Sequence, residues 1–169
     1  MSDLMHSAIR LQTAQPEDEE FLAQVYASSR EEELAQVAWN DDQKAAFLKS
    51  QHEAQHHHYR AYYPNADFDL ILLDGERIGR IYVDRRIEEI RLMDIALLPE
   101  FRNRGIGTKL IRDLMDEATR SQKFIGLHVE QFNRAYQLYT RFGFQDVEMR
   151  GIYMFMTWTA SKEEKNDAR

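Results

Sequence analysis

Hydrophobic and polar residues follow patterns along this chain that change several times between strand spacing and helix spacing. Residues 90–98 form an apolar run interrupted only by Arg91 and Asp94, which predicts a mostly buried strand. Pro99 ends this strand, because proline has no N–H for a β-ladder and restricts the residue before it. Further along, apolar residues recur on one face of a predicted helix: Leu110, Ile111, Leu114, Met115 and Ala118. A central strand and a helix are therefore expected, joined by a loop.

The remaining patterns predict a complete set of elements around that strand. Further strands are expected at residues 8–13, 68–73, 77–84, 124–129, 147–149 and 152–158. Further helices are expected from Pro16 onward, at residues 41–58 and at residues 133–141, while residues 28–39 are ambiguous. Asp74-Gly75 is a strong hairpin signal between two of the strands. The order β-α-α-β-β-β-α-β-α-β-β predicts an α/β fold with a mixed sheet, its antiparallel hairpins followed by parallel crossovers.

The helix at residues 41–58 is expected to begin at a cap formed by Asp41 or Asp42. Its candidates for burial are apolar: Ala45, Phe47 and Leu48. His56-His57-His58, with His52 four residues upstream of the first, could suggest a metal site. No downstream carboxylate or histidine pattern completes such a site, so we interpret these histidines as a solvated helix end and predict no metal ligands.

Length and composition restrict the class of protein. The 169 residues fit one domain, expected at residues 1–160, followed by a polar and disordered tail at residues 161–169. Without cysteine the chain has no disulfide, no thiolate metal site and no cysteine nucleophile. No secretion leader or apolar run of membrane-spanning length is visible, so a cytoplasmic protein without a membrane partner is expected. The net charge of −7 argues against nucleic-acid binding and permits cationic small molecules or peptide amines.

The loop between the central strand and its helix has the chemistry of a phosphate cradle. Glycine has no Cβ, so phosphates can approach the backbone, where free N–H groups and the helix dipole point at them. Arginines add charge-assisted hydrogen bonds. The cradle residues are Arg102, Asn103, Arg104, Gly105, Ile106, Gly107 and Thr108. The simpler alternative is an ordinary turn with two glycines and surface arginines.

The spacing of the residues in the loop distinguishes between known kinds of phosphate-binding loop. A P-loop would carry Lys-Ser or Lys-Thr after its second glycine, and a dinucleotide fingerprint would carry a third glycine where Leu110 stands. Arg102-x-x-Gly105-x-Gly107 instead resembles the acetyl-CoA-binding loop of the GNAT N-acetyltransferase superfamily, Arg/Gln-x-x-Gly-x-Gly/Ala. A second segment, running from Asn133 through Ala135 and Tyr139 to Phe144, is similar to the family's downstream signature. The family has two residues between this asparagine and alanine, whereas here Arg134 stands alone.

The resemblance implies a GNAT-like fold with central splayed strands flanked by helices. It also implies that acetyl-CoA is the co-substrate, with its pantetheine arm on the backbone of Ile95 and Leu97, its pyrophosphate at residues 102–108 and a further contact from Asn133. The activity implied is an acetyl-CoA-dependent N-acyltransferase, acting on a small-molecule or peptide amine by direct attack in a ternary complex. The alternatives are a catalytically silent acyl-CoA sensor on the same fold and a nucleotide-binding protein that shares a glycine loop.

Acetyl transfer needs a neutral amine, a stabilised oxyanion and a proton for the departing thiolate. The family commonly uses the tyrosine at the position of Tyr139 as the acid, and a tyrosine with a pKa near about 10 is protonated at neutral pH. Tyr139 could instead merely pack against the strand behind it. The candidate bases are acids on or beside the central strand: Glu88, Glu89 and Asp94. Each could equally be a surface or salt-bridged acid.

The acceptor region carries no diagnostic motif. Glu31-Glu32-Glu33 could form an aromatic and acidic pocket for a cationic amine with Trp39 and Tyr62-Tyr63, or be an exposed acidic turn. The final hairpin could be core or the face of a homodimer. Its large apolar residues are Met149, Tyr153, Met154, Phe155, Met156 and Trp158.

Overall fold

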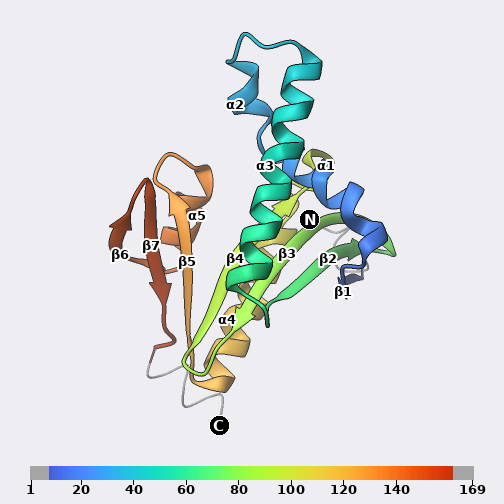
Figure 1. Ribbon diagram of the computed structural model, residues 1–169. Helices are drawn as coiled ribbons and strands as arrows, with labels where there is room; N and C mark the ends of the chain where they lie inside the picture. Colours follow the sequence, from blue (N-terminus) through green and yellow to red (C-terminus); the bar gives the residue numbers. More distant parts are fainter. Residues whose placement is uncertain (1–7, 162–169) are drawn as a thin grey trace. The chain divides into compact units, whose positions relative to one another are not determined.

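The computed structural model describes residues 8–161 as an α/β protein (Figure 1). Its strands are β1 (Ile9–Thr13), β2 (Asp67–Leu73), β3 (Glu76–Arg85), β4 (Glu89–Leu97), β5 (Phe124–Glu130), β6 (Gln145–Arg150) and β7 (Tyr153–Trp158). Its helices are α1 (Glu19–Ser29), α2 (Glu31–Ala35), α3 (Asp41–Tyr62), α4 (Ile106–Ser121) and α5 (Arg134–Arg141), with 3-10 turns η2 (Pro16–Asp18) and η3 (Pro99–Phe101). The predicted fold class is confirmed, and the ambiguous segment proves to contain the short helix α2.

The described residues divide into two compact units. The first holds the residues up to Tyr82 together with Asp94–Gly107, and the second holds Val83–Met93 and the residues from Thr108 onward. Strands β3 and β4 contribute to both units, and the mixed seven-stranded sheet has the order β1-β2-β3-β4-β5-β7-β6. The single domain at residues 1–160 stays a prediction, and the predicted tail beyond Ser161 lies outside the described residues.

The first unit is built around the hairpin of β2 and β3. Asp74 and Gly75 both have positive φ, 50° and 84°, as the predicted two-residue hairpin turn requires. On the other side of β2, β1 pairs antiparallel in a register from Ile9–Leu73 to Thr13–Asp69. The buried cluster that attaches α1 to this sheet consists of Phe21, Leu22, Val25 and Leu70. Burial of these apolar side chains fixes the position of α1 within the unit.

Helix α3 differs from its prediction at both ends. Asn40 caps it instead of Asp41 or Asp42, because its side chain accepts from the Gln43 N–H while the Gln43 side chain accepts from the Asn40 N–H. This reciprocal pair is a capping box. The helix also continues to Tyr62, beyond the predicted end.

The buried face of α3 is also different from the one expected. Ala45 is exposed and Phe47 and Leu48 are only half-buried. The fully buried residues of this helix are His52 and His56. The interpretation of these two histidines as a solvated helix end is therefore wrong, although it holds for His57 and His58, which are exposed.

The second unit contains the carboxyl-terminal strands. β5 pairs in parallel with β4 and antiparallel with β7, which in turn pairs antiparallel with β6. Helix α4 buries four residues of the predicted apolar face, Leu110, Ile111, Leu114 and Ala118, whereas Met115 is half-buried. In the final hairpin, four of the large apolar residues are buried, whereas Met149 and Tyr153 are exposed. The homodimer stays a prediction.

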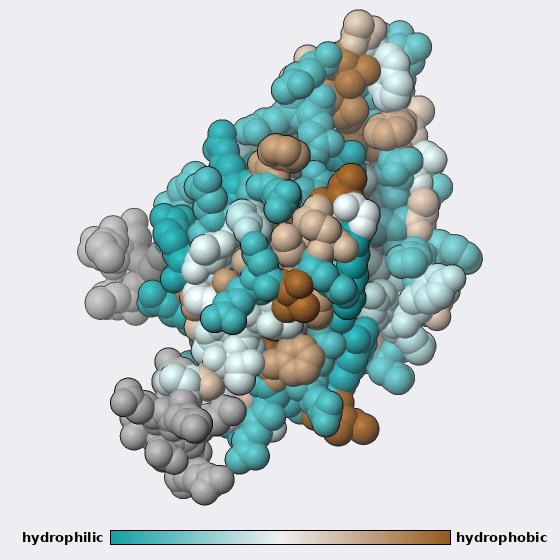
Figure 2. All heavy atoms as spheres, turned by 90° about the vertical axis from the view of Figure 1, so that its left-hand side faces the viewer, coloured by the Kyte–Doolittle hydropathy of each residue, from teal (hydrophilic) through white to brown (hydrophobic). Residues whose placement is uncertain are grey.

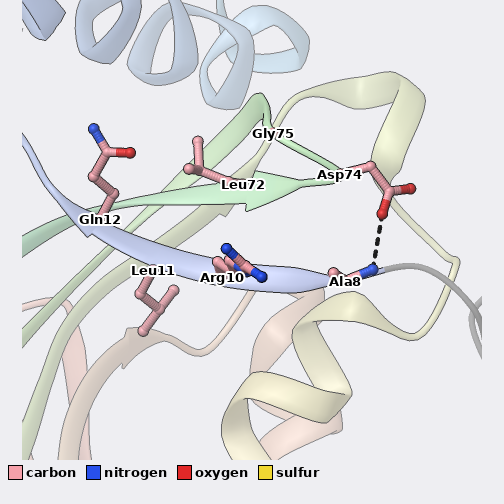
Figure 3. A pocket seen from close by; sticks show the side chains of 7 residues that line it. All are labelled: Ala8, Arg10, Leu11, Gln12, Leu72, Asp74 and Gly75. Atoms are coloured by element: carbon pink, nitrogen blue, oxygen red, sulfur yellow. Dashed lines mark hydrogen bonds between the residues drawn. The ribbon is translucent and has the colours of Figure 1, made fainter.

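A surface pocket of about 410 Å³ lies beside β1, in the first unit (Figure 3). Its walls are Ala8, Arg10, Leu11, Gln12, Leu72, Asp74 and Gly75, none of them a predicted site residue. One face of the molecule shows hydrophobic residues in small groups among hydrophilic ones (Figure 2). Within the described residues, no helix combines the length and apolar character that crossing a membrane requires.

Candidate active site

The carboxyl half of β4 leads into the predicted cradle. The parallel ladder of β4 with β5 runs from the pair Glu89–Phe124 to the pair Leu92–Leu127, so Asp94–Leu97 is not part of it. Residues 89–92 are buried and residues 93–97 are half-buried. On the β3 side, Gly79 lies so close to the backbone of Ala96 and Leu97 that a Cβ there would collide with it. The backbone of Ile95 and Leu97, predicted to meet pantetheine, thus lies in the part of β4 beyond this ladder.

The loop after β4 takes its shape from two residues in left-handed conformation. The turn η3 ends at Phe101, and beyond it Asn103 has φ 60° and Gly105 has φ 82°. Asparagine and glycine are the residues that adopt this region most readily. Residues 102–105 are exposed, whereas Ile106, the first residue of α4, is buried and anchors the start of the helix.

The two loop arginines have different partners. Arg102 donates from Nε to the Leu97 carbonyl at 3.0 Å and from Nη2 to the Ser28 carbonyl at 3.3 Å. It therefore ties the loop to the end of β4 and to the end of α1. Arg104 is exposed, and its guanidinium lies 5.5 Å from the centre of the Phe101 ring. Two carbonyl groups thus hold Arg102, whereas the guanidinium of Arg104 is in a position to bind an anion.

The space around Gly107 indicates whether a phosphate group fits at this helix start. A Cβ added at Gly107 would meet no atom within 4 Å, and its φ is not positive. Neither packing nor backbone conformation within the protein therefore requires glycine here. The first N–H groups of α4, which include those of Ile106, Gly107 and Thr108, have no intrahelical acceptor. An open, bare helix start of this kind suits an anionic group.

Glu89, one of the three candidate bases, is a buried ion-paired residue of the second unit. Its carboxylate lies 2.6 Å from Arg91 Nε and 3.2 Å from Arg86 Nη1. It also occupies the space beside Gly126 of β5, where a Cβ would collide with Glu89 Oε2. The ion pairs explain its burial, and its place beside β5 explains why glycine stands at position 126.

Asp94, a second candidate base, belongs to the first unit and is also ion-paired. Its Oδ2 atom lies 2.6 Å from Arg80 Nη2, and the side chain of Arg80 is almost fully buried. Both candidate carboxylates therefore already neutralise an arginine. Glu88, the third acid, is exposed.

A buried polar network extends from Asp94 through the first unit, and the sequence analysis did not find it. Its members are Asp94, Arg80, Tyr82, His56, His52 and Glu19. Arg80 Nη1 donates to the Tyr82 hydroxyl at 3.4 Å, and that hydroxyl lies 2.7 Å from His56 Nε2. Burial lowers the pKa of both histidines from the ordinary value, and the positive charge of Arg80 also lowers it. Burial likewise raises the pKa of the Tyr82 hydroxyl. Near neutral pH the imidazoles are thus uncharged.

The downstream motif forms the start and body of α5 in the second unit. Asn133 is the N-cap of this helix, because its Oδ1 accepts from the Ala135 N–H at 2.9 Å. Tyr139 is buried, with its ring centre 5.5 Å from that of Phe144. The Phe144 N–H donates to the Tyr139 carbonyl at 3.0 Å and closes the end of the helix. The capping bond gives Asn133 a structural role, and its predicted cofactor contact stays a prediction.

The residues predicted to form an acceptor pocket do not lie together. Trp39 packs on Phe47 at the beginning of α3, with ring centres 5.2 Å apart. Tyr62 stacks on His58 at its end, with ring centres 4.6 Å apart. Phe47 and Tyr62 are 15 residues apart on α3, which separates them by about 22 Å at 1.5 Å per residue. A single pocket lined by Trp39, Tyr62 and Tyr63 is therefore excluded. Glu31–Glu33 is exposed as expected, but it forms the first turn of helix α2 and not a loop turn.

Comparison with known proteins identifies the family and the fold of the chain. The family model described as "Acetyltransferase (GNAT) family" matches residues 15–144. No protein among curated sequences matches the chain significantly. Among solved structures, the PaiA N-acetyltransferase of Thermoplasma acidophilum in complex with coenzyme A is similar, with TM-score 0.68, 18% identity and coverage of 90% of this chain and 99% of that chain. Naa50 of Arabidopsis thaliana, in complex with the bisubstrate analogue CoA-Ac-MVNAL, has TM-score 0.59, 17% identity and coverage of 90% and 99%.

Proposed function

The chain belongs to the acetyltransferase (GNAT) family, and from this premise we propose that it transfers an acetyl group from acetyl-CoA to an amine of a small molecule or peptide. The observation that supports the proposal most strongly is the exposed loop at residues 102–105, which opens onto a bare helix start. The likeness to two proteins solved with coenzyme A or a CoA-peptide analogue supports the same co-substrate.

The cofactor residues have defined tasks in this proposal. The N–H groups of Ile106, Gly107 and Thr108 bind the pyrophosphate, together with the helix dipole. Gly105 gives the loop its left-handed turn, and Arg104 supplies positive charge. Arg102 and Asn103 shape the loop instead of binding phosphate through their side chains.

The reaction requires few groups from the protein. Acetyl-CoA supplies the thioester, the acceptor nitrogen attacks its carbonyl carbon, and the bond between carbon and sulfur then breaks. The backbone of Ile95 and Leu97 holds the pantetheine arm, and the Leu97 N–H stabilises the oxyanion. Tyr139 donates its phenolic proton to the departing sulfur. The order is direct attack in a ternary complex, in keeping with the absence of cysteine.

The identity of the acceptor determines whether a base is needed. An α-amine has a pKa of about 7.7–8.0 and a lysine amine about 10.4, so deprotonation near pH 7 costs about 1 kcal/mol or about 4–5 kcal/mol respectively. Two of the three candidate bases, Glu89 and Asp94, are ion-paired with arginines. These ion pairs favour an α-amine acceptor, because water can deprotonate it without either carboxylate.

The ion pairs of Glu89 and Asp94 also support a second candidate function. A catalytically silent acyl-CoA sensor would need the loop but no base, and two arginine-bound carboxylates are compatible with it. Turnover on any amine distinguishes the enzyme from the sensor.

The testing experiment measures release of free CoA thiol with acetyl-CoA and a panel of α-amines, lysine derivatives and polyamines. The wild type is compared with Tyr139→Phe and with the control Tyr136→Phe, which alters a tyrosine three residues earlier on the same helix. We expect turnover to fall about 100-fold or more in Tyr139→Phe, with CoA affinity retained, and to be unchanged in the control.

Two results would contradict this proposal. Equal turnover by the wild type and Tyr139→Phe would remove the assigned acid. Tight acetyl-CoA binding without turnover on any amine of the panel would favour the sensor.

A further inference from the structure

Two buried histidines and one carboxylate of the first unit converge between α1 and α3. His52 and His56 lie four residues apart, so they share one face of α3. Glu19 is the first residue of α1. Its Oε1 atom lies 2.9 Å from His56 Nδ1 and 3.3 Å from His52 Nε2. The three ligand-type atoms all lie within 4.8 Å of one another.

The two distances from Glu19 to the histidine nitrogens are close to those between ligand atoms around a small divalent cation. Ligand atoms bound tetrahedrally at 2.0–2.1 Å from zinc lie about 3.3 Å apart. Two histidines and one glutamate form a ligand set that zinc sites use, with a fourth position left to water. Two histidines spaced i, i+4 on a helix are likewise a known way of presenting two ligands to one ion.

The orientation of the imidazoles separates coordination from plain hydrogen bonding. Despite their proximity to Glu19, His52 Nε2 and His56 Nδ1 have no hydrogen-bond partner among the described residues. Neither nitrogen therefore forms a well-aligned hydrogen bond with the carboxylate, although both lie within 3.3 Å of it. Ligand lone pairs point at a shared ion and not at one another. His52 is only 2% exposed and His56 only 6%, and such burial makes unsatisfied nitrogens costly.

The surroundings supply further features of a metal site. The second nitrogen of His56, Nε2, lies 2.7 Å from the Tyr82 hydroxyl, an outer partner of the kind that fixes the tautomer of a ligating histidine. The guanidinium of Arg80 is the nearby positive charge, and Asp94 neutralises it at 2.6 Å. The side chain of Glu19 is 45% exposed, which gives an ion a path from solvent.

We propose that Glu19, His52 and His56 bind a divalent transition-metal ion of the zinc class, which joins α1 to α3. The proposal does not depend on acetyl transfer. The ion adds a cross-link at the place where α3 buries histidines instead of apolar side chains. Binding to the folded form alone stabilises that form.

The test uses the full-length chain without an affinity tag, freed of metal by chelator and dialysis. Zn²⁺ alone is titrated by calorimetry, and Co²⁺ alone is titrated by the visible absorption that a tetrahedral Co²⁺ site gives. We expect one equivalent to bind, with a rise in Tm. Glu19→Gln and His52→Gln should each weaken Zn²⁺ binding by about 100-fold or more, and Tyr82→Phe by about 10–100-fold.

The matched control is the double variant His57→Gln, His58→Gln, which alters the two exposed histidines of the same run. It should bind Zn²⁺ as the wild type does. Glu19→Gln keeps the test decisive even if His52→Gln fails to fold, because the Glu19 side chain is partly exposed and its replacement has nearly the same size. Absence of Zn²⁺ binding, equal binding by Glu19→Gln, or loss of binding in the His57, His58 control would overturn the proposal.

Discussion

The proposed cofactor loop at residues 102–107 and the buried polar network are two differently built regions of the same compact unit. The loop is contiguous in sequence and exposed at residues 102–105, and we propose that it binds through backbone N–H groups at a helix start. The network is buried over most of its length and works through side chains contributed by α1, α3, β3 and β4. A backbone site tolerates most side-chain changes that preserve its shape, whereas a buried side-chain network loses stability when one member is removed.

The two regions therefore respond to substitution in opposite ways. Changes in the loop should alter cofactor binding and have little effect on folding. Changes in the network should alter folding and leave the cofactor loop intact. Each substitution below is matched with a control that separates these effects.

The largest effect is expected when the network loses Arg80. In Arg80→Met the carboxylate of Asp94 and the hydroxyl of Tyr82 lose a buried partner. Removing one member of a buried ion pair lowers the free energy of unfolding by about 3–5 kcal/mol. Because Asp94 is partly exposed, we expect a loss at the lower end of this range, about 3 kcal/mol. Urea denaturation measures it.

The control for that change is Arg77→Met on the same strand. Arg77 pairs with Asp18 at 3.1 Å, but its side chain is 46% exposed, so the loss should stay below about 1 kcal/mol. Similar losses in the two variants would show that the network contributes no more than a surface pair.

A smaller effect is expected when Tyr82 loses its hydroxyl. In Tyr82→Phe the Nε2 atom of buried His56 loses its partner, which should lower the unfolding free energy of metal-free protein by about 1–3 kcal/mol. Tyr62→Phe is the control, because Tyr62 is 73% exposed, and its effect should stay within about 0.5 kcal/mol. Denaturation in the presence of chelator gives both values. An unchanged free energy of unfolding in Tyr82→Phe would show that the hydrogen bond between Tyr82 and His56 does not stabilise the fold.

The smallest effects on stability are expected in the loop. Gly105→Ala forces alanine into a left-handed conformation at φ 82°, at a cost of about 1–2 kcal/mol. Gly107→Ala meets no atom and should be neutral or stabilising by up to about 1 kcal/mol. It should nevertheless weaken CoA binding, because its Cβ enters the space assigned to phosphate. Thermal denaturation and CoA titration separate the two, and unchanged CoA affinity in Gly107→Ala would contradict the assignment.

The contrast between the regions also explains what could be predicted from the sequence. Local signals located the strands, the Asp74-Gly75 hairpin and the glycine loop correctly, because each depends on adjacent residues. The family resemblance, now supported by the match over residues 15–144, rests on the same kind of contiguous motif. The roles given to Ile95, Leu97, Asn133 and Tyr139 stay predictions.

The network was missed because its members are far apart in the chain. His52 and His56 had the i, i+4 spacing of a shared helix face, but the carboxylate beside them is Glu19, upstream on another helix. The search for a downstream ligand could not find it. Conversely, Trp39 and Tyr62 are close in sequence yet lie at opposite ends of α3. Sequence distance predicts spatial distance only when the intervening structure is known.

The most direct test of the proposed cofactor site measures CoA affinity by calorimetry for the wild type, Gly105→Ala and Gly105→Glu. All three proteins share the loop, and the two variants share the strain of a Cβ at φ 82°, but only glutamate adds negative charge to the cradle. We predict that Gly105→Glu is folded by circular dichroism and binds no CoA, while Gly105→Ala keeps part of the affinity. A folded Gly105→Glu protein that binds CoA as tightly as the wild type would contradict the assignment of residues 102–107 to the phosphates.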